Sequence, residues 1–457
     1  MMGWRSRSFL LLAGVGGTSA LLYLVNFRLA SLLDLLGIID PKGGALAAYP
    51  YLFFPLFALY GLAVAIVFRK RSGPTFVGLI VGFAILFRVT LLASPPVLSS
   101  DLYRYIWDGR VQIAGINPYL YPPAAEELAP LRDEDIFPHI NRQEAPTIYP
   151  PGAQMLFALI ATAVPDSVTA LKAIMVLFDI GTILLILRLL NKAGIRSDRV
   201  LLYAWSPLAI FEVAGSGHLE ALMLPVVLLA LLARKNGKSV LAGIALGVAT
   251  LIKLYPAALF PAVYKRRDRM FPLAFGATIL LGYLPYLYGA QGRVLGFLPA
   301  YVGPWEDFNV GLRHFLTLAL APFTASPRPV AMLLLTALLG AVAIYVMRQR
   351  HTEAFLWYGY VMVSAYLLLL PTSFHPWYVV WILPFLCFYP SWGWLYLSGA
   401  IALSYLKYVQ GSPAVPLTIR LLEFLPLYVL LAIEAVRHRH PEAGPGKTVT
   451  LMMEKSQ

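Results

Sequence analysis

Cysteine is almost absent from this sequence. Among the 457 residues there is one, Cys387, and it lies inside an apolar segment. A single thiol forms no intrachain disulfide and cannot build a zinc or redox motif that needs several cysteines. The sequence therefore predicts a fold that is stabilised by packing alone.

Charge is also scarce, and several common catalytic motifs are missing. Only 13% of the residues are charged. The sequence contains no Walker loop, no GxGxxG after a strand, no HExxH and no nucleophile elbow. No polar stretch is long enough for the cytoplasmic domain that a nucleotide-sugar enzyme would need. The sequence therefore gives no support for the reactions of the common soluble enzyme classes that carry these motifs.

Hydrophobic residues dominate instead. They make up 59% of the chain, and the mean hydropathy is +0.71. Apolar runs of about 20 residues recur along the whole length, and no alternating strand pattern competes with them. We predict an all-α polytopic membrane protein with about 12 to 14 transmembrane helices. The expected spans lie near 9–27, 49–68, 76–97, 169–190, 200–216, 218–233, 239–264, 271–289, 328–347, 354–371, 377–389, 391–407 and 418–436.

The net charge of +13 has a topological explanation. Basic residues form short clusters between apolar runs, for example Arg69 to Arg71 and Lys265 to Arg269, rather than one continuous patch. The positive-inside rule places such clusters in the cytoplasm. We therefore expect no nucleic-acid partner, and we read the basic, apolar N-terminus as an uncleaved first helix.

One integral-membrane domain is expected over 1–436, followed by a cytoplasmic, disordered tail at 437–457. Its expected parts are an N-terminal two-helix extension at 1–75, a core at 76–264 with a first outer loop at 98–168, and C-terminal helices at 265–436 with a second outer loop at 291–327. The apolar piece that ends the first outer loop, from Thr147 to Pro165, is short for a span and is expected to be interfacial or re-entrant.

The segment 239–264 poses a topological problem. It lies between two basic clusters, so it must cross the membrane twice or not at all, yet 26 residues are too few for two full helices. Pro256 and Pro261 interrupt the run. We predict two short half-helices, a device that transporters also use around midplane sites.

The unusual polar residues gather on the outer side. Asp101 and Asp108 follow the third span, His218 and Glu220 lie in one outward turn, and His375 lies in another. Two cations, Arg88 and Lys253, lie inside apolar segments, where a charge costs about 2.5 to 3.5 kcal/mol unless it faces protein or water. These residues predict an outward-facing polar site for an anionic ligand, and Tyr378 is one of the aromatic residues suited to stack a sugar ring. The candidate substrate-binding residues are Arg88, Arg104, Asp108, His218, Glu220, Lys253, His375 and Tyr378.

Structural interpretations compete with these roles. Asp101 follows two serines and fits a helix N-cap, or it is a carboxylate that takes a proton from an attacking hydroxyl. Asp108 could pair with Arg104 one helical turn before it. Arg88 and Lys253 could pair with buried acids or bind a lipid phosphate. The two histidines could be hydrogen-bonded turn residues.

The order of these motifs resembles a known group. The run "DLYRYIWDGR" with "GINPYLYP" is followed by "YPPGAQ", "GHLEA", "IKLYP" and "HPWYVVWILPF". Over residues 76–390 this is similar to the GT-C superfamily of integral-membrane glycosyltransferases, and most similar to glycosyltransferase family 87. In contrast to that pattern, two extra spans precede the first outer loop here.

The resemblance implies that a sugar, with mannose as the first candidate, moves from a polyprenyl-phosphate donor to a lipid or glycan acceptor. It assigns the base to Asp101 and implies inversion, with Arg88, Lys253 and Arg104 near the leaving phosphate and His375 and His218 near phosphate or sugar. It implies no cofactor. Related eukaryotic enzymes carry a closely spaced acidic pair, whereas Asp101 and Asp108 are seven residues apart, so no metal ligand is assigned and a divalent metal stays open. The expected location is the plasma or inner membrane, among membrane lipids, with the site facing the exterior or periplasm.

A transporter or flippase and a membrane scaffold are the two alternative classes of protein. A transporter or flippase for a lipid-linked saccharide would also use broken helices and intramembrane charges, but it should place them near the midplane between repeats. This sequence places them at one face beside a long loop and shows no repeat. A membrane scaffold would give no reason for Arg88, Lys253 and the first outer loop.

Overall fold

The computed structural model describes residues 2–40, 43–69, 74–302, 307–349 and 354–437. Within them the regular structure is helical, which confirms the predicted all-α class. The expected tail at 437–457 lies outside the described residues except for Arg437. The longer helices are α1 (Met2–Leu35), α2 (Gly44–Arg69), α3 (Pro74–Leu92), α6 (Val168–Lys192), α9 (Glu220–Lys235), α10 (Ser239–Ile252), α12 (Met270–Leu287), α15 (Pro327–Arg348), α16 (Phe355–Leu369) and α21 (Leu417–Arg437).

Membrane spans account for much of this helical content. Among the described residues, six helices are long and apolar enough to cross a bilayer, namely α1, α2, α3, α6, α12 and α15. A seventh candidate is a bent pair, Pro207–Gly215 with Glu220–Lys235, whose two parts meet at 119°. The chain is therefore a multi-pass membrane protein. We expected about 12 to 14 spans from the sequence. Several of the expected spans form helices that are too short to be identified as spans by their length, so the larger number stays a prediction.

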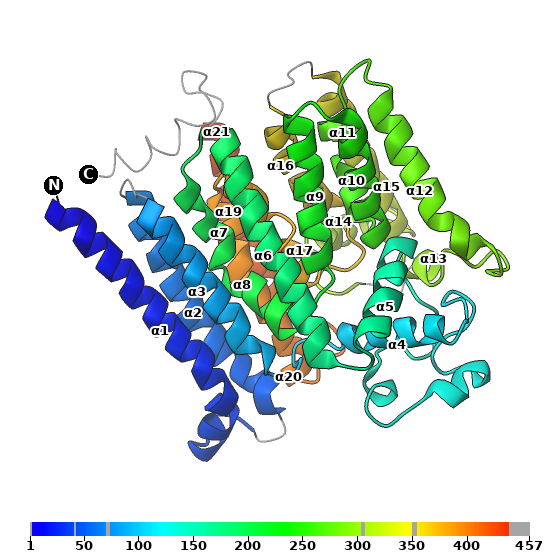
Figure 1. Cartoon of the computed structure of the whole chain (residues 1–457), viewed down its shortest axis with the longest axis horizontal. Helices are drawn as coiled ribbons and strands as arrows, with labels where there is room; N and C mark the ends of the chain where they lie inside the picture. The colour runs from blue at the N-terminus through cyan, green and yellow to red at the C-terminus, as the bar shows by residue number, and fades with distance from the viewer. Residues whose placement is uncertain (1, 41–42, 70–73, 303–306, 350–353, 438–457) are drawn as a thin grey trace.

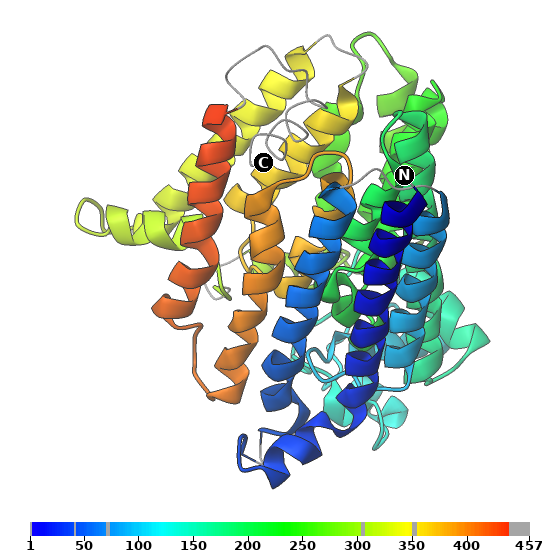
Figure 2. The same ribbon diagram turned by 90° about the vertical axis from the view of Figure 1, so that its left-hand side faces the viewer.

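The three N-terminal helices pack side by side along one edge of the bundle (Figure 1). The same edge is seen face-on in Figure 2, where α19 (Trp392–Ala400) and α21 run beside them. Tyr23 of α1 and Tyr49 of α2 both contact the ring of Phe211. The predicted two-helix extension is thus packed against a segment of the core.

The first outer loop lies at one end of the bundle (Figure 1). It begins with α4 (Asp101–Ile113) and ends with α5 (Pro151–Ala163), and these two helices pack against each other. The short 3-10 helices η2 (Glu126–Leu131) and η3 (Phe137–His139) lie between them. At 13 residues, α5 is too short for a perpendicular span, as its length in the sequence predicted.

Three expected spans, 200–216, 377–389 and 391–407, are broken into short pieces. Residues 197–215 form η4 (Ser197–Val200), α7 (Leu201–Ala204), α8 (Pro207–Ile210) and the π-helix η5 (Phe211–Gly215). Proline at the first position of α8 lacks the N–H that would continue α7. Residues 376–409 likewise form α17 (Pro376–Val379), α18 (Leu383–Leu386), α19, η7 (Ile401–Tyr405) and α20 (Leu406–Val409).

The segment 239–264 is broken as expected, but at a different residue. Helix α10 ends at Ile252, and Lys253 is extended with φ −151° and ψ 140°. The chain continues as η6 (Tyr255–Leu259) and α11 (Phe260–Val263). The break thus precedes Pro256, since Lys253, two residues before the 3-10 turn, already leaves the helical region. The Lys253 side chain therefore lies outside the regular helix.

The second outer loop is partly described. It contains α13 (Leu298–Tyr301) and α14 (Leu312–Leu320), which is amphipathic. Arg420 of α21 donates hydrogen bonds to the carbonyl oxygens of Val310 at 3.0 Å and Asp307 at 3.2 Å. These bonds hold the loop against the C-terminal helix.

Candidate active site

A sharp turn before α9 brings a histidine to α4. Gly217 has φ +72°, and a Cβ atom there would lie 2.4 Å from Leu102 Cδ1. Only glycine accepts both the backbone conformation and the close approach. His218 follows directly and is 1% exposed. The turn therefore fixes this imidazole beside the first turn of α4.

Asp101 is the first residue of α4, and its carboxylate contacts residues outside that helix. The N-cap is Ser100, which makes no side-chain capping bond. Asn141 Nδ2 donates to Asp101 Oδ1 at 2.7 Å, and Asp101 Oδ2 lies 3.9 Å from His218 Nδ1. The side chain keeps 20% exposure. Asp101 is therefore not the N-cap of α4. Its partly exposed carboxylate is accessible to a ligand.

Besides Asp101 and His218, the site contains a second pair of charged residues. Lys253 and Glu220 form an ion pair, and Trp381 Nε1 donates to Glu220 Oε1 at 2.9 Å. The Tyr105 phenol is buried near both carboxylates: burial raises its pKa well above the usual value, and the charges of Asp101 and Glu220 raise it further. The predicted residues Asp101, His218, Glu220 and Lys253 are thus brought to one end of the bundle.

Aromatic rings flank these polar groups in two stacks. Tyr255 stacks on Trp381 with centroids 3.9 Å apart, and Tyr378 stacks on the same tryptophan at 4.4 Å. Lys253 Nζ lies 5.2 Å from the Tyr378 ring centroid. The Tyr378 hydroxyl is 3.1 Å from that of Tyr301. These contacts place Tyr378 beside the Lys253 ammonium group, where cation–π attraction stabilises it.

The second stack carries both predicted histidines. His375 lies between Phe308 at 4.4 Å and Trp377 at 4.3 Å, and Trp377 stacks on His218 at 4.0 Å. Because Phe308 belongs to the second outer loop, the stack connects that loop to the imidazole beside Asp101. The rings fix the positions of the two histidines by packing.

His375 is surrounded by cations. Its pKa is lowered well below the usual 6.5, first by burial and then by the charges of His218, Lys253, Arg142 and Lys407. The imidazole is therefore neutral near pH 7. Lys253, Arg142 and Lys407 give the surroundings of His375 a positive charge, which favours an anionic group beside this ring.

Replacement of His375 by Phe should weaken the acid sensitivity of the fold. The folded-state pKa lies below the unfolded value of 6.5, so the unfolded chain binds more protons and stability falls as the pH drops through 6.5. Phenylalanine keeps the ring stack and removes this titration. Thermal unfolding of the detergent-solubilised protein at pH 7 and pH 5 should show a smaller loss in His375→Phe than in wild type. Equal losses would refute this role of His375.

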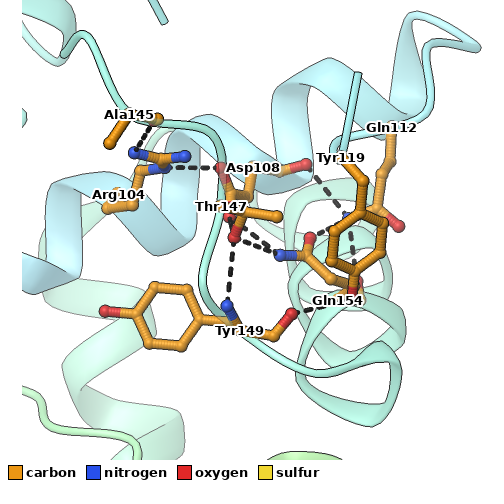
Figure 3. A network of polar contacts seen from close by, with 8 residues as sticks. All are labelled: Arg104, Asp108, Gln112, Tyr119, Ala145, Thr147, Tyr149 and Gln154. Carbon is orange, nitrogen blue, oxygen red and sulfur yellow. Dashed lines mark hydrogen bonds and ion pairs between the residues drawn. The ribbon is translucent and has the colours of Figure 1, made fainter. Parts of the chain in front are cut away.

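Asp108 is occupied by the first outer loop (Figure 3). Arg104 Nε donates to its Oδ1 at 2.8 Å, and Gln154 Nε2 donates to its Oδ2 at 2.8 Å. The Thr147 hydroxyl also donates to Oδ2, at 2.5 Å. Arg104 further donates to the Ala145 carbonyl oxygen at 3.1 Å. Asp108 and Arg104 therefore hold the loop onto α4 and α5, which is the structural alternative rather than the predicted substrate contact.

Arg88 is also engaged elsewhere. It is fully buried, forms an ion pair with Asp179 and donates to the Ala204 carbonyl oxygen at 2.7 Å. The Tyr203 hydroxyl donates to the other oxygen of Asp179. The structure thus supports pairing with a buried acid for Arg88 and does not bring this residue into the cluster around Asp101.

Some residues of the cluster were not among the predicted site residues. Asn141 lies in an irregular part of the first outer loop with no motif around it. Glu212 was visible only as an isolated charge in an apolar run, and it lies 3.2 Å from His218 Nε2. Trp377 and Trp381 are part of "HPWYVVW", a pattern that fits an interfacial aromatic belt equally well. Among the described residues, no group of three or more His, Cys, Asp or Glu side chains is placed to hold a metal ion.

Comparison with known proteins assigns a family to this arrangement. Residues 11–265, more than half of the chain, match the family model described as "Alpha-(1->6)-mannopyranosyltransferase, N-terminal domain" of the MptA_B family. The match begins within α1, so it includes the two N-terminal helices that the GT-C resemblance left unassigned, and it covers Asp101, His218 and Lys253. A search of curated proteins found no match to the sequence. The resemblance to membrane mannosyltransferases is confirmed, and the chain belongs to the MptA_B family of alpha-(1->6)-mannopyranosyltransferases.

Proposed function

We propose that this mannosyltransferase takes mannose from a polyprenyl-phosphate donor and transfers it, with inversion, to a lipid or glycan acceptor at the outer face of the cell membrane. Asp101 acts as the general base. The observation that carries the proposal is that the partly exposed carboxylate of Asp101 and the carboxylate of Glu220, which pairs with Lys253, both lie near the Tyr105 phenol of α4, in the first outer loop.

Asp101 has the contacts that a general base needs. One carboxylate oxygen accepts a hydrogen bond from Asn141, which fixes the orientation of the group. The other oxygen faces His218 at 3.9 Å, beyond hydrogen-bonding distance. Its 20% exposure leaves room for an acceptor hydroxyl. In the reaction the acceptor oxygen bonds to the anomeric carbon, and its proton passes to Asp101.

Lys253 supports the departure of the phosphate. As the bond from the anomeric carbon to the phosphate oxygen breaks, the electron pair stays on the phosphate and its negative charge grows. A fixed cation at that position stabilises the transition state more than the ground state. Glu220 and the rings of Tyr378 and Trp381 hold the Lys253 ammonium group in place. Arg142 and Lys407 add positive charge around His375.

The proposed orientation follows from the charge pattern of the sequence. Basic residues occupy the last turns of α2, α9, α15 and α21. The positive-inside rule assigns such ends to the cytoplasm. The first outer loop, with Asp101, then faces the exterior or periplasm, where a lipid-linked sugar can be presented by the membrane itself.

The direct test supplies the donor. Purified protein in lipid vesicles is given polyprenyl-phosphate mannose, labelled in the sugar, together with lipid acceptors. We expect label in the acceptor and one equivalent of free polyprenyl phosphate, and no transfer from a nucleotide-linked mannose. Transfer from the nucleotide sugar alone would refute the proposed donor, and movement of the intact donor across the vesicle without cleavage would favour a flippase.

A further inference from the structure

A lateral groove lies between α2 and the paired helices α19 and α21. Its volume is about 750 Å³, within the range of roughly 300 to 1,000 Å³ that small-molecule sites occupy. Figure 2 shows the three helices side by side. Helix α19 packs against α21, where a Cβ atom on Gly393 would lie 3.0 Å from Leu431. The groove therefore has one wall from α2 and one from a packed helix pair.

The α2 wall is one regular face of the helix. The residues of this face recur every four positions and line the groove, namely Phe57, Gly61, Ala65 and Arg69. A Cβ atom on Gly61 would meet nothing within 4 Å among the described residues, so the space beside this glycine is open. At the other end, a Cβ atom on Gly399 of α19 would lie 2.4 Å from the Phe57 ring. The groove is thus closed at Phe57 and hollow toward Arg69.

The length of the groove matches one leaflet of a bilayer. From Phe57 to Arg69 the helix rises by about 18 Å, at about 1.5 Å per residue. The hydrocarbon core is about 30 Å thick, so one leaflet contributes about 15 Å. Arg69 is the last residue of α2, at the end that the proposed orientation assigns to the cytoplasm. An acyl chain of the cytoplasmic leaflet therefore fits along α2 with its head group at Arg69.

The hydroxyl groups of the two walls are engaged within the protein. The Tyr60 hydroxyl donates to the Leu202 carbonyl oxygen at 2.8 Å. The Tyr396 hydroxyl donates to the Leu422 carbonyl oxygen at 2.6 Å. Among the described residues that line the groove, Arg69 carries the only charge. The groove therefore suits an amphiphile that has a long apolar chain and an anionic head group.

The acids near Arg69 are engaged by other groups. Asp198 pairs with Arg196 at 2.6 Å, and Arg196 also donates to the Val67 carbonyl oxygen of α2 at 2.7 Å. Glu434 of α21 accepts two backbone N–H groups at the start of α19. Within the described part of the chain, Arg69 itself forms no ion pair. Its guanidinium group is thus the cation that the groove offers to an anion, and arginine matches the geometry of a phosphate group.

We infer that the groove binds one anionic phospholipid of the cytoplasmic leaflet, with an acyl chain along Gly61 and Ala65 and the phosphate at Arg69. Basic pockets between transmembrane helices on the cytoplasmic side are typical sites for anionic head groups. The lipid bridges α2 and α19, so it stabilises the docking of the two N-terminal helices on the rest of the bundle. Helix α3 runs from the Arg69 end to the end that bears Asp101, so this site lies away from the proposed catalytic residues.

The test measures lipid retention by the full-length protein in mild detergent, using native mass spectrometry. Phosphatidylglycerol and phosphatidylcholine are added in equal amounts, and wild type should retain one phosphatidylglycerol per chain. Gly61→Leu fills the groove and should lose this lipid. Gly82→Leu is the matched control, because Gly82 is an exposed glycine of α3 with open space beside it, and it should keep the lipid. Equal retention in Gly61→Leu and wild type would overturn the inference.

Two further measurements keep this test decisive if Gly61→Leu does not fold. Ala65→Leu fills the groove one turn further along the same wall and should lose the lipid as well. Added phosphatidylglycerol should raise the thermal unfolding midpoint of wild type but not that of the filled variant, because a ligand that binds only the folded state stabilises it. An equal rise in both proteins would contradict binding in the groove.

A charge variant tests the contact with the head group. Arg69→Gln should lower the preference for phosphatidylglycerol over phosphatidylcholine about fivefold, the usual effect of one basic residue at an anionic surface. Arg188→Gln is the control, since Arg188 is an exposed arginine near the end of α6, and it should leave the preference unchanged. Equal losses in both variants would show a general surface attraction. Displacement of the lipid by inorganic phosphate would show a site for free anions, and loss of a dimer rather than of lipid in Gly61→Leu would assign the groove to a second copy. Each of these three results would overturn the inference.

Discussion

Asp101→Asn should reduce mannose transfer by about 100- to 10,000-fold, the usual contribution of a general base. Asparagine has nearly the same shape and can keep the contact with Asn141, but it cannot accept the proton of the acceptor hydroxyl. The measurement is the initial rate of transfer from polyprenyl-phosphate mannose in reconstituted vesicles. Donor binding should change much less than kcat, because the lost interaction exists mainly in the transition state.

The control for this variant is another acid of the first outer loop. Asp135 is exposed on that loop, so Asp135→Asn changes the same amount of charge on the same face. It should keep its activity. Equal thermal stability of wild type and Asp101→Asn would show that the loss is chemical. Full activity in Asp101→Asn would remove Asp101 from the role of base.

The second large effect is expected for Lys253→Met. The variant leaves Glu220, which is 0% exposed, without its cation, and the loss of one partner of a buried ion pair costs about 3 to 5 kcal/mol. Because Lys253 keeps 19% exposure, we expect about 3 kcal/mol, at the lower end of that range. Donor binding should weaken as well, since the proposed phosphate cation is lost. Thermal unfolding and donor titration measure the two effects separately.

The double variant Lys253→Met with Glu220→Gln separates stability from function. It removes the unpaired charge, and the glutamine can still accept the hydrogen bond from Trp381. We expect most of the stability to return while donor affinity stays low. Recovery of both properties would mean that Lys253 only neutralises Glu220 and does not hold the donor phosphate.

The two aspartates of α4 show where sequence analysis reached its limit. Both lie near the predicted outer face, and their spacing puts them on one side of the helix. Asp108 is nevertheless bonded to Thr147 and Gln154, which are 39 and 46 residues away in the chain. No local pattern contains that information, because it depends on how the first outer loop returns to α5. The pairing of Asp108 with Arg104, which is local, was visible from the four-residue spacing.

Broken helices show the same division. The apolar runs predicted helices in a membrane, and the longest of them, including α2, α6 and α15, match the described structure closely. The run 376–409 forms short helices and turns instead. Its prolines alone do not explain this, because α2 stays one continuous helix across Pro50 and Pro55. Hydropathy measures whether a segment prefers the bilayer, but it carries little information about the backbone once a segment is surrounded by other helices.

The sequence by itself determined the fold class of the protein, the predicted sidedness of its loops and the candidate site residues. Long apolar runs predict the spans, clustered basic residues predict the sidedness, and charged residues in apolar surroundings mark the candidates. Each of these signals depends on local composition. Only the tertiary structure decided which charged residues share a site. It paired Arg88 with Asp179 and Arg104 with Asp108, and it brought Asp101, His218 and Lys253 to the same end of the bundle. Charge pairing inside a membrane protein is decided by which helices become neighbours, and that is a property of the packed fold.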